Sequence, residues 1–227
     1  KKGLCPSAIR TALIPFSFVY SAGVGLRNCL YSSGLIKPKK AAVPVISIGN
    51  LTAGGTGKTP AALMIARYFI EQGVSAALVA RGYGNSEGKL NDELLMARDK
   101  VNNLKVYASS DRYSGAETAV SEGADLIILD DGFQHRQLHR DCNILTIDSR
   151  NFQSAHLLLP AGPFREPWRN RKRADIILLT KCDPDNIPDH EESDIPVFCT
   201  SHEVTGITAN RTPEPVGSYS DKKVFLV

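Results

Sequence analysis

VPVISIGNLTAGGTGKTPAALMIARYF, residues 43–69, is the stretch that determines the fold class of this chain. Its first part, 43–48, is a short β-branched run of the kind expected for a buried parallel strand. The glycine-rich segment 49–59 follows, and the apolar residues from Leu63 to Phe69 then indicate a helix. A strand, a glycine-rich loop ending in Lys-Thr and a helix, in this order, predict a phosphate-binding loop.

The glycine-rich segment carries residue types suited to holding a nucleotide. Glycines let backbone N–H groups surround phosphate oxygens, Lys58 supplies a cation near the β- and γ-phosphates, and Thr59 offers a hydroxyl to Mg²⁺. The following helix adds the positive end of its dipole. The common pattern G-x-x-x-x-G-K-[ST] would need glycine in place of Thr52, so an ordinary glycine-rich turn is the alternative. The predicted nucleotide-binding residues are Thr52, Ala53, Gly54, Gly55, Thr56, Gly57, Lys58 and Thr59.

A second apolar run ends in two acids. Residues 124–129 have the pattern of another buried strand, and Asp130 and Asp131 follow it directly. An acid at the end of such a strand is typical of the carboxylate that faces Mg²⁺ beside a phosphate-binding loop. Taken alone, the acids could equally belong to an ordinary turn. Together with Thr59, they predict a Mg²⁺ site.

Further short runs complete an α/β pattern. We expect additional strands at 76–80, 104–107, 143–147, 175–180 and 197–199, and helices near 91–99 and 113–122. Residues 183–194 are rich in acids and proline and predict a solvated loop. The sequence therefore predicts an α/β fold of the P-loop NTPase type, in which helices flank a mainly parallel sheet.

The amino-terminal part differs in charge from the rest. Residues 1–70 contain nine basic and no acidic residues, whereas the remainder contains 18 basic and 24 acidic residues. The uncharged stretch 11–26 lies between Arg10 and Arg27, and it is shorter than the roughly 20 residues that a membrane-spanning helix needs. A core helix and an amphipathic helix at a membrane surface both fit this pattern. We expect residues 1–40 to form a membrane-associating helical segment and 41–227 to form the P-loop domain.

Composition excludes several classes of protein. The hydrophobic fraction of 42% and the charged fraction of 22% are those of a globular protein, and the net charge of +3 does not indicate a nucleic-acid partner. The five cysteines are scattered without a C-x-x-C pair, which favours reduced thiols over disulfides or zinc. The chain begins without Met and stops inside an apolar run, so we expect it to be a fragment.

Five sequence blocks, taken in order, resemble the tetraacyldisaccharide 4′-kinase family of lipid A biosynthesis. They are IGNLTAGGTGKTP at 48–60, RGY at 81–83, SDR at 110–112, LDDGFQHR at 129–136 and LLPAGPFREP at 158–167. In this family the phosphate-binding loop itself carries threonine at position 52. The resemblance implies transfer of the γ-phosphoryl group of ATP, with Mg²⁺, to the 4′-hydroxyl of a tetraacyldisaccharide 1-phosphate. It also implies a peripheral, monomeric enzyme at the cytoplasmic face of the bacterial inner membrane.

The resemblance further implies roles for individual residues. Lys58 and Arg165 are expected to act on the transferred phosphoryl group, and Glu166 is expected near Mg²⁺ with Asp130, Asp131 and Thr59. Arg112 would supply further positive charge. Asp92 is the best match to the base that accepts the hydroxyl proton, although its surroundings, NDEL, differ from the more usual GDEP. The histidine that orients this base in the family should lie beyond Val227.

Other functions stay open at this stage. Arg165 and Glu166 could form a surface ion pair or begin a helix. Thr180-Lys-Cys-Asp183 follows an expected strand and is similar to the guanine-binding motif of GTPases. A partitioning-type ATPase has a similar glycine-rich loop, and a degenerate relative could bind lipid without catalysis.

Overall fold

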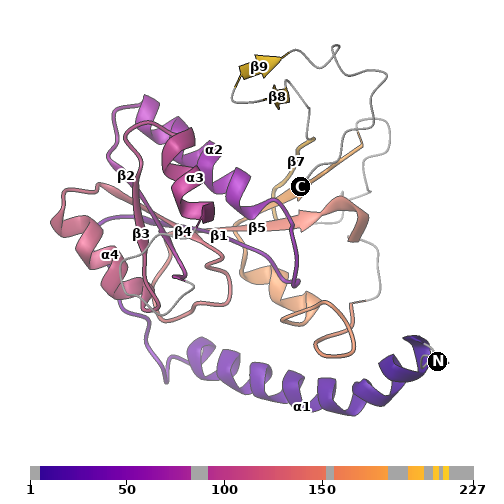
Figure 1. The fold of residues 1–227 in the computed structure, drawn as a ribbon. Coiled ribbons are helices and arrows are strands. Elements are labelled where there is room, and N and C mark those ends of the chain that lie inside the picture. Colours follow the sequence, from indigo (N-terminus) through magenta and orange to yellow (C-terminus); the bar gives the residue numbers. More distant parts are fainter. Residues whose placement is uncertain are drawn as a thin grey trace.

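The computed structural model describes residues 6–82, 92–151, 156–183, 194–201, 207–209 and 212–214. Seven strands form one sheet in the order β3-β2-β4-β1-β5-β6-β7, and every neighbouring pair is parallel (Figure 1). The strands are β1 (Val45–Gly49), β2 (Ala76–Ala80), β3 (Lys105–Ala108), β4 (Leu126–Asp130), β5 (Cys142–Asp148), β6 (Ile176–Thr180) and β7 (Val197–Cys199). The mainly parallel sheet predicted from the sequence is confirmed.

Helices cover both faces of this sheet. Strand side chains alternate between two apolar layers, so that Leu78 of β2 packs with α2 (Lys58–Glu71) and α3 (Asp92–Lys100). Its neighbour Val79 packs on the other face with α4 (Arg112–Ser121). This two-sided burial explains why the strands appear in the sequence as continuous apolar runs.

The predicted strands of the sheet and the helices near 91–99 and 113–122 agree with the structure to within about two residues at each boundary. The helix indicated by residues 63–69 begins earlier, at Lys58. Short elements without an apolar pattern were not predicted. They are the 3₁₀ helices η1 (Ser149–Asn151) and η2 (Trp168–Arg173) and the antiparallel pair β8 (Ile207–Ala209) and β9 (Thr212–Glu214). Most of the loop predicted at 183–194 lies outside the described residues.

The amino-terminal segment is a single helix, α1 (Pro6–Ser32), that lies along one side of the molecule (Figure 1). It contains Pro15 in its interior. On the inner side, Ser17 Oγ donates to Leu158 O at 3.0 Å and Tyr20 Oη donates to Arg165 O at 2.9 Å. The helix is therefore held to the loop that contains residues 158–165.

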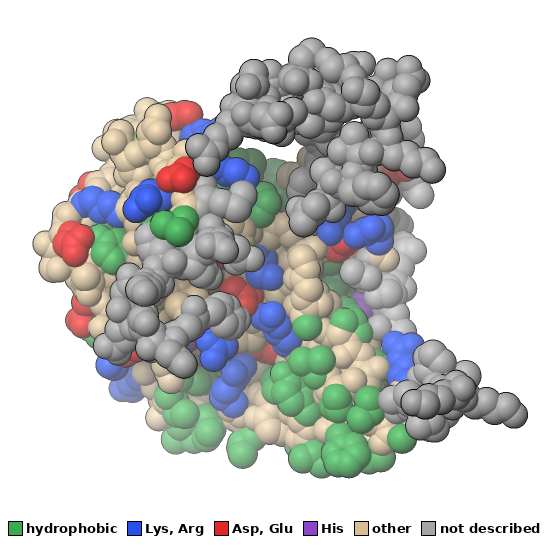
Figure 2. Space-filling model, in the orientation of Figure 1, with side chains coloured by type: hydrophobic (Ala, Val, Ile, Leu, Met, Phe, Trp, Pro, Cys, Tyr) green, Lys and Arg blue, Asp and Glu red, His purple; other side chains and the backbone are tan. Residues whose placement is uncertain are grey.

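The outer side of α1 is apolar. Phe16, Phe18 and Val19 are exposed by 64%, 72% and 73%, and Leu26 is also exposed. Figure 2 shows hydrophobic side chains gathered over this helix, with Lys and Arg side chains directly above them. Of the two possibilities left by the sequence, this surface fits an interfacial helix better than a core helix. None of the described helices has the length and apolarity needed to cross a membrane.

Candidate nucleotide-binding and catalytic site

The loop between β1 and α2 depends on glycine at its end. Gly57 caps α2 with a φ of 77°, in the left-handed region that L side chains rarely adopt. A Cβ atom placed there would also lie 3.3 Å from Thr180 Cγ2. Gly57 therefore permits both the turn into α2 and the close approach of β6, and the N-terminus of α2 opens toward the space above the loop.

Buried hydrogen bonds hold the loop in one shape. Asn50 Nδ2 donates to Thr56 Oγ1 at 2.9 Å, and Thr56 Oγ1 lies 2.9 Å from Thr146 Oγ1 on β5. Thr180 Oγ1 on β6 donates to Thr56 O at 2.9 Å. The loop is thus fixed to two strands before any ligand binds, which lowers the cost of ordering it around phosphates.

Lys181 also holds the phosphate loop, a role that was not predicted from the sequence. Its Nζ atom donates to Gly55 O at 2.8 Å and to Asp148 Oδ2 at 3.0 Å. Hydrogen bonds from Arg150 and from Lys181 hold the pKa of Asp148 far below its usual range, so this acid stays ionised. Thr180 and Lys181, the first two residues of the segment similar to the guanine-binding motif, therefore hold the phosphate loop in place. The position of this segment directly after a strand was the available signal.

Asp130 has the environment expected for a metal ligand. It ends β4 beside Ile48 of β1, and its Oδ2 atom accepts a hydrogen bond from Thr59 Oγ1 at 2.9 Å. Its Oδ1 atom is buried and has no hydrogen-bond partner among the described residues. Burial raises the pKa of this carboxyl group, against the lowering effect of the Thr59 hydrogen bond. The predicted grouping of Asp130 with Thr59 is confirmed.

Asp131 faces two cations instead. Its carboxylate accepts hydrogen bonds from Arg165 Nη1 at 2.8 and 3.1 Å, and Lys58 Nζ lies 3.8 Å away. Asp131 has a φ of 54°, which turns the chain sharply after β4. The next residue must be glycine, since a Cβ at Gly132 would lie 2.5 Å from Ser47 Oγ. Asp131 therefore places Lys58 and Arg165 side by side.

Arg165 reaches the site on a loop that pairs with the phosphate loop. Ala53 N donates to Pro163 O at 2.7 Å, and Arg165 N donates to Leu51 O at 2.7 Å. Thr52 forms a bridge with Phe164 in the same place. Thr52 and Ala53, predicted to bind the nucleotide, thus connect the two loops and do not line the cavity described below.

Glu166 departs from its expected role at the metal. Its side chain is completely buried, and both carboxylate oxygens are occupied by donors from α1 and η2. The donors are Arg27 at 3.0 Å, Asn28 at 3.0 Å, Asn170 at 2.6 Å and Arg173 at 2.6 Å. These are the contacts of a buried ion-pair network, so Glu166 connects α1 to the body, and it does not line the cavity described below. Nothing in the sequence around Glu166 indicates these partners, which lie on α1 and η2.

A cavity of about 380 Å³ lies over the loop. It is lined by residues 54–60 and by Ala80, Arg81, Leu94, Asp130 and Asp131. Leu94 belongs to α3, which begins at Asp92, but the side chain of Asp92 lies outside the described part of the chain. Arg112 is buried at the start of α4 and does not line this cavity. The cavity brings together the phosphate loop and the strand-end acids, as the sequence predicted.

A phosphate-binding loop after a parallel strand, with an acid at the end of the adjacent strand, defines a P-loop nucleotide-binding protein. The model of the tetraacyldisaccharide-1-P 4′-kinase family matches residues 9–226. The chain therefore belongs to this family, as the five sequence blocks indicated.

Individual proteins that are similar to this chain belong to the same family. The tetraacyldisaccharide 4′-kinase of Aquifex aeolicus is 39% identical over 187 residues, which are 76% of this chain and 59% of that protein. That of Bdellovibrio bacteriovorus is 38% identical over 189 residues, 77% of this chain and 56% of that protein. The crystal structure of the "apo" form of LpxK from Aquifex aeolicus in complex with ATP has a TM-score of 0.81 at 33% identity, covering 95% of this chain and 72% of that one. The chain spans less than two thirds of the curated relatives it matches.

Proposed function

We propose that this chain is part of an ATP-dependent kinase that phosphorylates the 4′-hydroxyl of a tetraacyldisaccharide 1-phosphate in lipid A biosynthesis. The observation that carries the proposal is the cavity in which Lys58, Thr59 and the strand-end acids surround one space, in a chain of the 4′-kinase family. The relatives named above are 4′-kinases, and the similar Aquifex structure contains ATP.

Asp130 and Thr59 are the proposed ligands of Mg²⁺. The buried Oδ1 atom of Asp130 lacks a partner among the described residues, and a carboxylate and a hydroxyl are oxygen donors of the kind that Mg²⁺ takes. No cluster of three or more His, Cys, Asp or Glu side chains that could hold a metal occurs in the described residues. This fits Mg²⁺, which usually binds through one or two carboxylates together with substrate phosphates and water. When bound, the ion neutralises charge on the phosphate oxygens.

Lys58 and Arg165 are the proposed cations that act on the transferred group. Phosphoryl transfer spreads negative charge over the equatorial oxygens, so that fixed cations stabilise the transition state without reorganising. Asp131 contacts both side chains and is proposed to orient them toward the cavity, beside the metal site. Because Asp131 already holds both cations, their side chains need little further ordering before phosphoryl transfer.

Asp92 is proposed as the base that accepts the proton of the acceptor hydroxyl. Its place at the start of α3, near cavity-lining Leu94, supports this role. Replacing Asp92 with Asn keeps its size and removes its basicity, so kcat should fall by a factor of about 10² to 10⁴. Isothermal titration should give an unchanged Kd for ATP. Full activity of Asp92→Asn would mean that another group accepts the proton.

The acceptor is proposed to be met at the cytoplasmic face of the inner membrane, with the enzyme bound peripherally through α1. The exposed Phe16, Phe18 and Val19 support this placement, because they give α1 an apolar outer side. The inner side of α1 holds the loop that carries Arg165, so the proposed membrane contact adjoins the proposed catalytic site.

The reaction itself is tested by following label from γ-³²P-ATP in the complete protein. We expect label in a tetraacyldisaccharide 1-phosphate presented in mixed micelles, and none in the matched acceptor that carries hydrogen in place of the 4′-hydroxyl. ATP hydrolysis at the same rate with and without acceptor would contradict the proposal and favour an ATPase. Competition by GTP as effective as that by ATP would favour the GTPase alternative suggested by residues 180–183.

A further inference from the structure

A second polar cavity, of about 320 Å³, lies away from the nucleotide site. Its lining includes Asn143, at the start of β5, and Asp175, just before β6. The phosphate loop follows the opposite, carboxyl ends of the parallel strands. The cavity also contacts Tyr31 of α1 and Pro38 after it, so it adjoins the amino-terminal segment. We call it the arginine pocket, because Arg136, Arg140 and Arg173 line it.

The arginine pocket has an excess of positive charge. Burial lowers the pKa of Arg136 and of Arg173, and it lowers that of Arg140 to about 10, with Arg173 and Arg136 adding repulsion at Arg140. Of the pocket arginines, Arg173 is paired with Glu166, and Asp175 accepts from the backbone N–H of Asn143. Arg136 and Arg140 have no ion pair with an acid among the described residues, so they carry the excess charge. Half-buried cations that repel one another favour the binding of an anion.

Hydrogen-bonding groups in the pocket are left over for a ligand. Arg136 uses Nη1 for Asn28 O and Ser32 Oγ, and Arg140 uses Nη1 for three backbone carbonyls of residues 132–135. The other N–H groups of these two side chains have no hydrogen bond within the described residues. Asn143 is only 5% exposed, and its Oδ1 atom likewise lacks a partner there. The site thus offers donors to an anion and one acceptor to a hydroxyl group.

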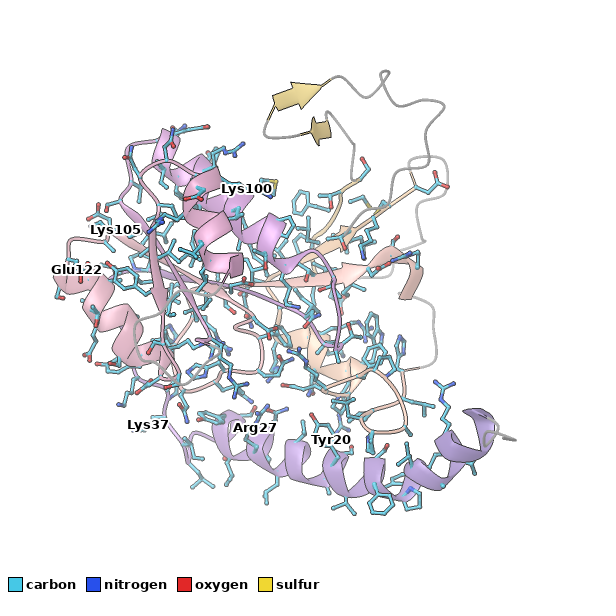
Figure 3. All side chains as sticks on the ribbon, in the orientation of Figure 1. Tyr20, Arg27, Lys37, Lys100, Lys105 and Glu122 are labelled. Atoms are coloured by element: carbon cyan, nitrogen blue, oxygen red, sulfur yellow. The ribbon has the colours of Figure 1, made fainter. Side chains whose placement is uncertain are left out.

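The rim of the pocket continues into the surface proposed to face the membrane. Between Tyr31 and Pro38 the chain exposes Leu35 by 77%, together with Ile36 and Lys37. Lys39 and Lys40, directly after Pro38, are exposed as well. Figure 3 shows Lys37 just beyond the end of α1, the helix that carries Tyr20 and Arg27. Exposed apolar and basic side chains side by side suit the boundary between acyl chains and anionic headgroups.

We infer that the arginine pocket binds the headgroup of an anionic glycerophospholipid, with the phosphate on Arg136 and Arg140 and a headgroup hydroxyl at Asn143. Planar guanidinium groups suit phosphate because they donate two parallel hydrogen bonds. The inference rests on the proposed membrane contact of α1, but it needs neither ATP nor the kinase reaction. It adds a lipid site separate from the one that would hold the phosphoryl acceptor.

The test is binding to phosphatidylcholine vesicles with and without phosphatidylglycerol, in the absence of ATP and of the acceptor lipid. The variant Arg136→Gln/Arg140→Gln should lose about thirtyfold in affinity for phosphatidylglycerol vesicles, at about 1 kcal/mol for each basic residue. Its weaker binding to phosphatidylcholine alone should not change, since that binding depends on apolar α1. The matched control Arg171→Gln/Lys172→Gln removes two charges from neighbouring η2, outside the pocket, and should lose at most a few-fold.

Equal losses in the two double variants would overturn the inference, because they would show diffuse attraction only. The inference would also be overturned if Arg136→Gln/Arg140→Gln kept the preference for phosphatidylglycerol vesicles and had a raised KM for the acceptor. The pocket would then bind the acceptor's own phosphate. If Arg136→Gln/Arg140→Gln does not fold, Pro38→Glu tests the same site. That exposed residue places a carboxylate at the rim, and should weaken phosphatidylglycerol binding while thermal unfolding and ATP binding stay unchanged.

Discussion

Gly57 combines two constraints at one position. Its left-handed backbone lets the loop enter α2, and its missing side chain leaves room for Thr180. Gly55, two residues earlier, lines the same cavity, but a Cβ atom there would meet nothing within 4 Å. Substituting each of these two glycines therefore distinguishes the need for a left-handed backbone at Gly57 from a general need for glycine in the loop.

Gly57→Ala should lower the free energy of unfolding by about 1–2 kcal/mol, since a left-handed conformation costs that much for an L residue. ATP binding should weaken as well, because the start of α2 shifts. Gly55→Ala should leave stability unchanged or slightly raised. Urea unfolding and ATP titration of both variants check this. Equal destabilisation by both would refute the constraint at Gly57.

His135 makes stability depend on pH. Burial, aided by the charge of Arg112, lowers the pKa of His135 to about 4, and its Nε2 atom is buried without a partner in the described residues. An unfolded histidine titrates near 6.5. Between these two values the unfolded state binds the proton more readily, so the free energy of unfolding should decrease as pH falls from about 6.5 toward 4.

The variant His135→Gln should reduce this slope, which urea unfolding at pH 7 and pH 5 would measure. The remaining histidines are common to both proteins, so the difference between the two slopes reports His135 alone. If the free energy of unfolding changed equally with pH in both proteins, His135 would be free to protonate in the folded protein.

At the scale of elements, α1 has an apolar outer side, proposed to contact lipid, and an inner side that packs on the body. Phe16 and Phe18 point outward, whereas Tyr20 and Arg27 hold the loop of Arg165 and Glu166. The apolar outer side and the polar inner contacts do not share residues. Membrane binding can therefore be weakened without disturbing the fold.

Replacing Phe16 and Phe18 with Ser should weaken binding to vesicles by about a hundredfold or more, because each buried aromatic side chain contributes about 1.5–3 kcal/mol. The affinity for ATP should not change. The matched control Met64→Ser/Tyr68→Ser removes two exposed apolar side chains from α2 and should bind vesicles normally. Loss of ATP binding in the Phe16/Phe18 variant would show that α1 belongs to the core.

Elements with a strong local pattern were predictable from the sequence. The β-branched run of β1, the glycines of the loop and the acids after β4 are local signals, and their grouping follows from parallel strands. The contacts of Lys181 and Glu166 were not predictable, because their partners lie on distant segments. The sequence suggested Glu166 for the metal and gave no indication that Arg27 and Asn28 of α1 pack against it. Adjacency to Arg165 carries no information on the direction of a side chain.

At the scale of the whole molecule, the strand order brings the functional loops to one edge. β1 lies between β4 and β5, with β6 next to β5, and all four strands are parallel. Their carboxyl ends carry the phosphate loop, Asp130, Asp148 and Lys181. The proposed lipid headgroup site lies near the opposite ends of β5 and β6, where the end of α1 approaches. The nucleotide cavity and the arginine pocket thus lie at opposite ends of the parallel strands.

The central claim is that this phosphate loop drives phosphoryl transfer to the lipid acceptor. It is tested most directly by the rate of γ-³²P transfer to a tetraacyldisaccharide 1-phosphate in the complete protein with Lys58→Ala. We predict a loss of at least about a hundredfold in kcat, since Lys58 is placed to stabilise charge that develops on the phosphoryl oxygens. The control Lys105→Ala removes a half-buried lysine of β3 that contacts Glu122 away from the cavity (Figure 3), and should keep the full rate. Transfer by Lys58→Ala at the unmodified rate would contradict the account.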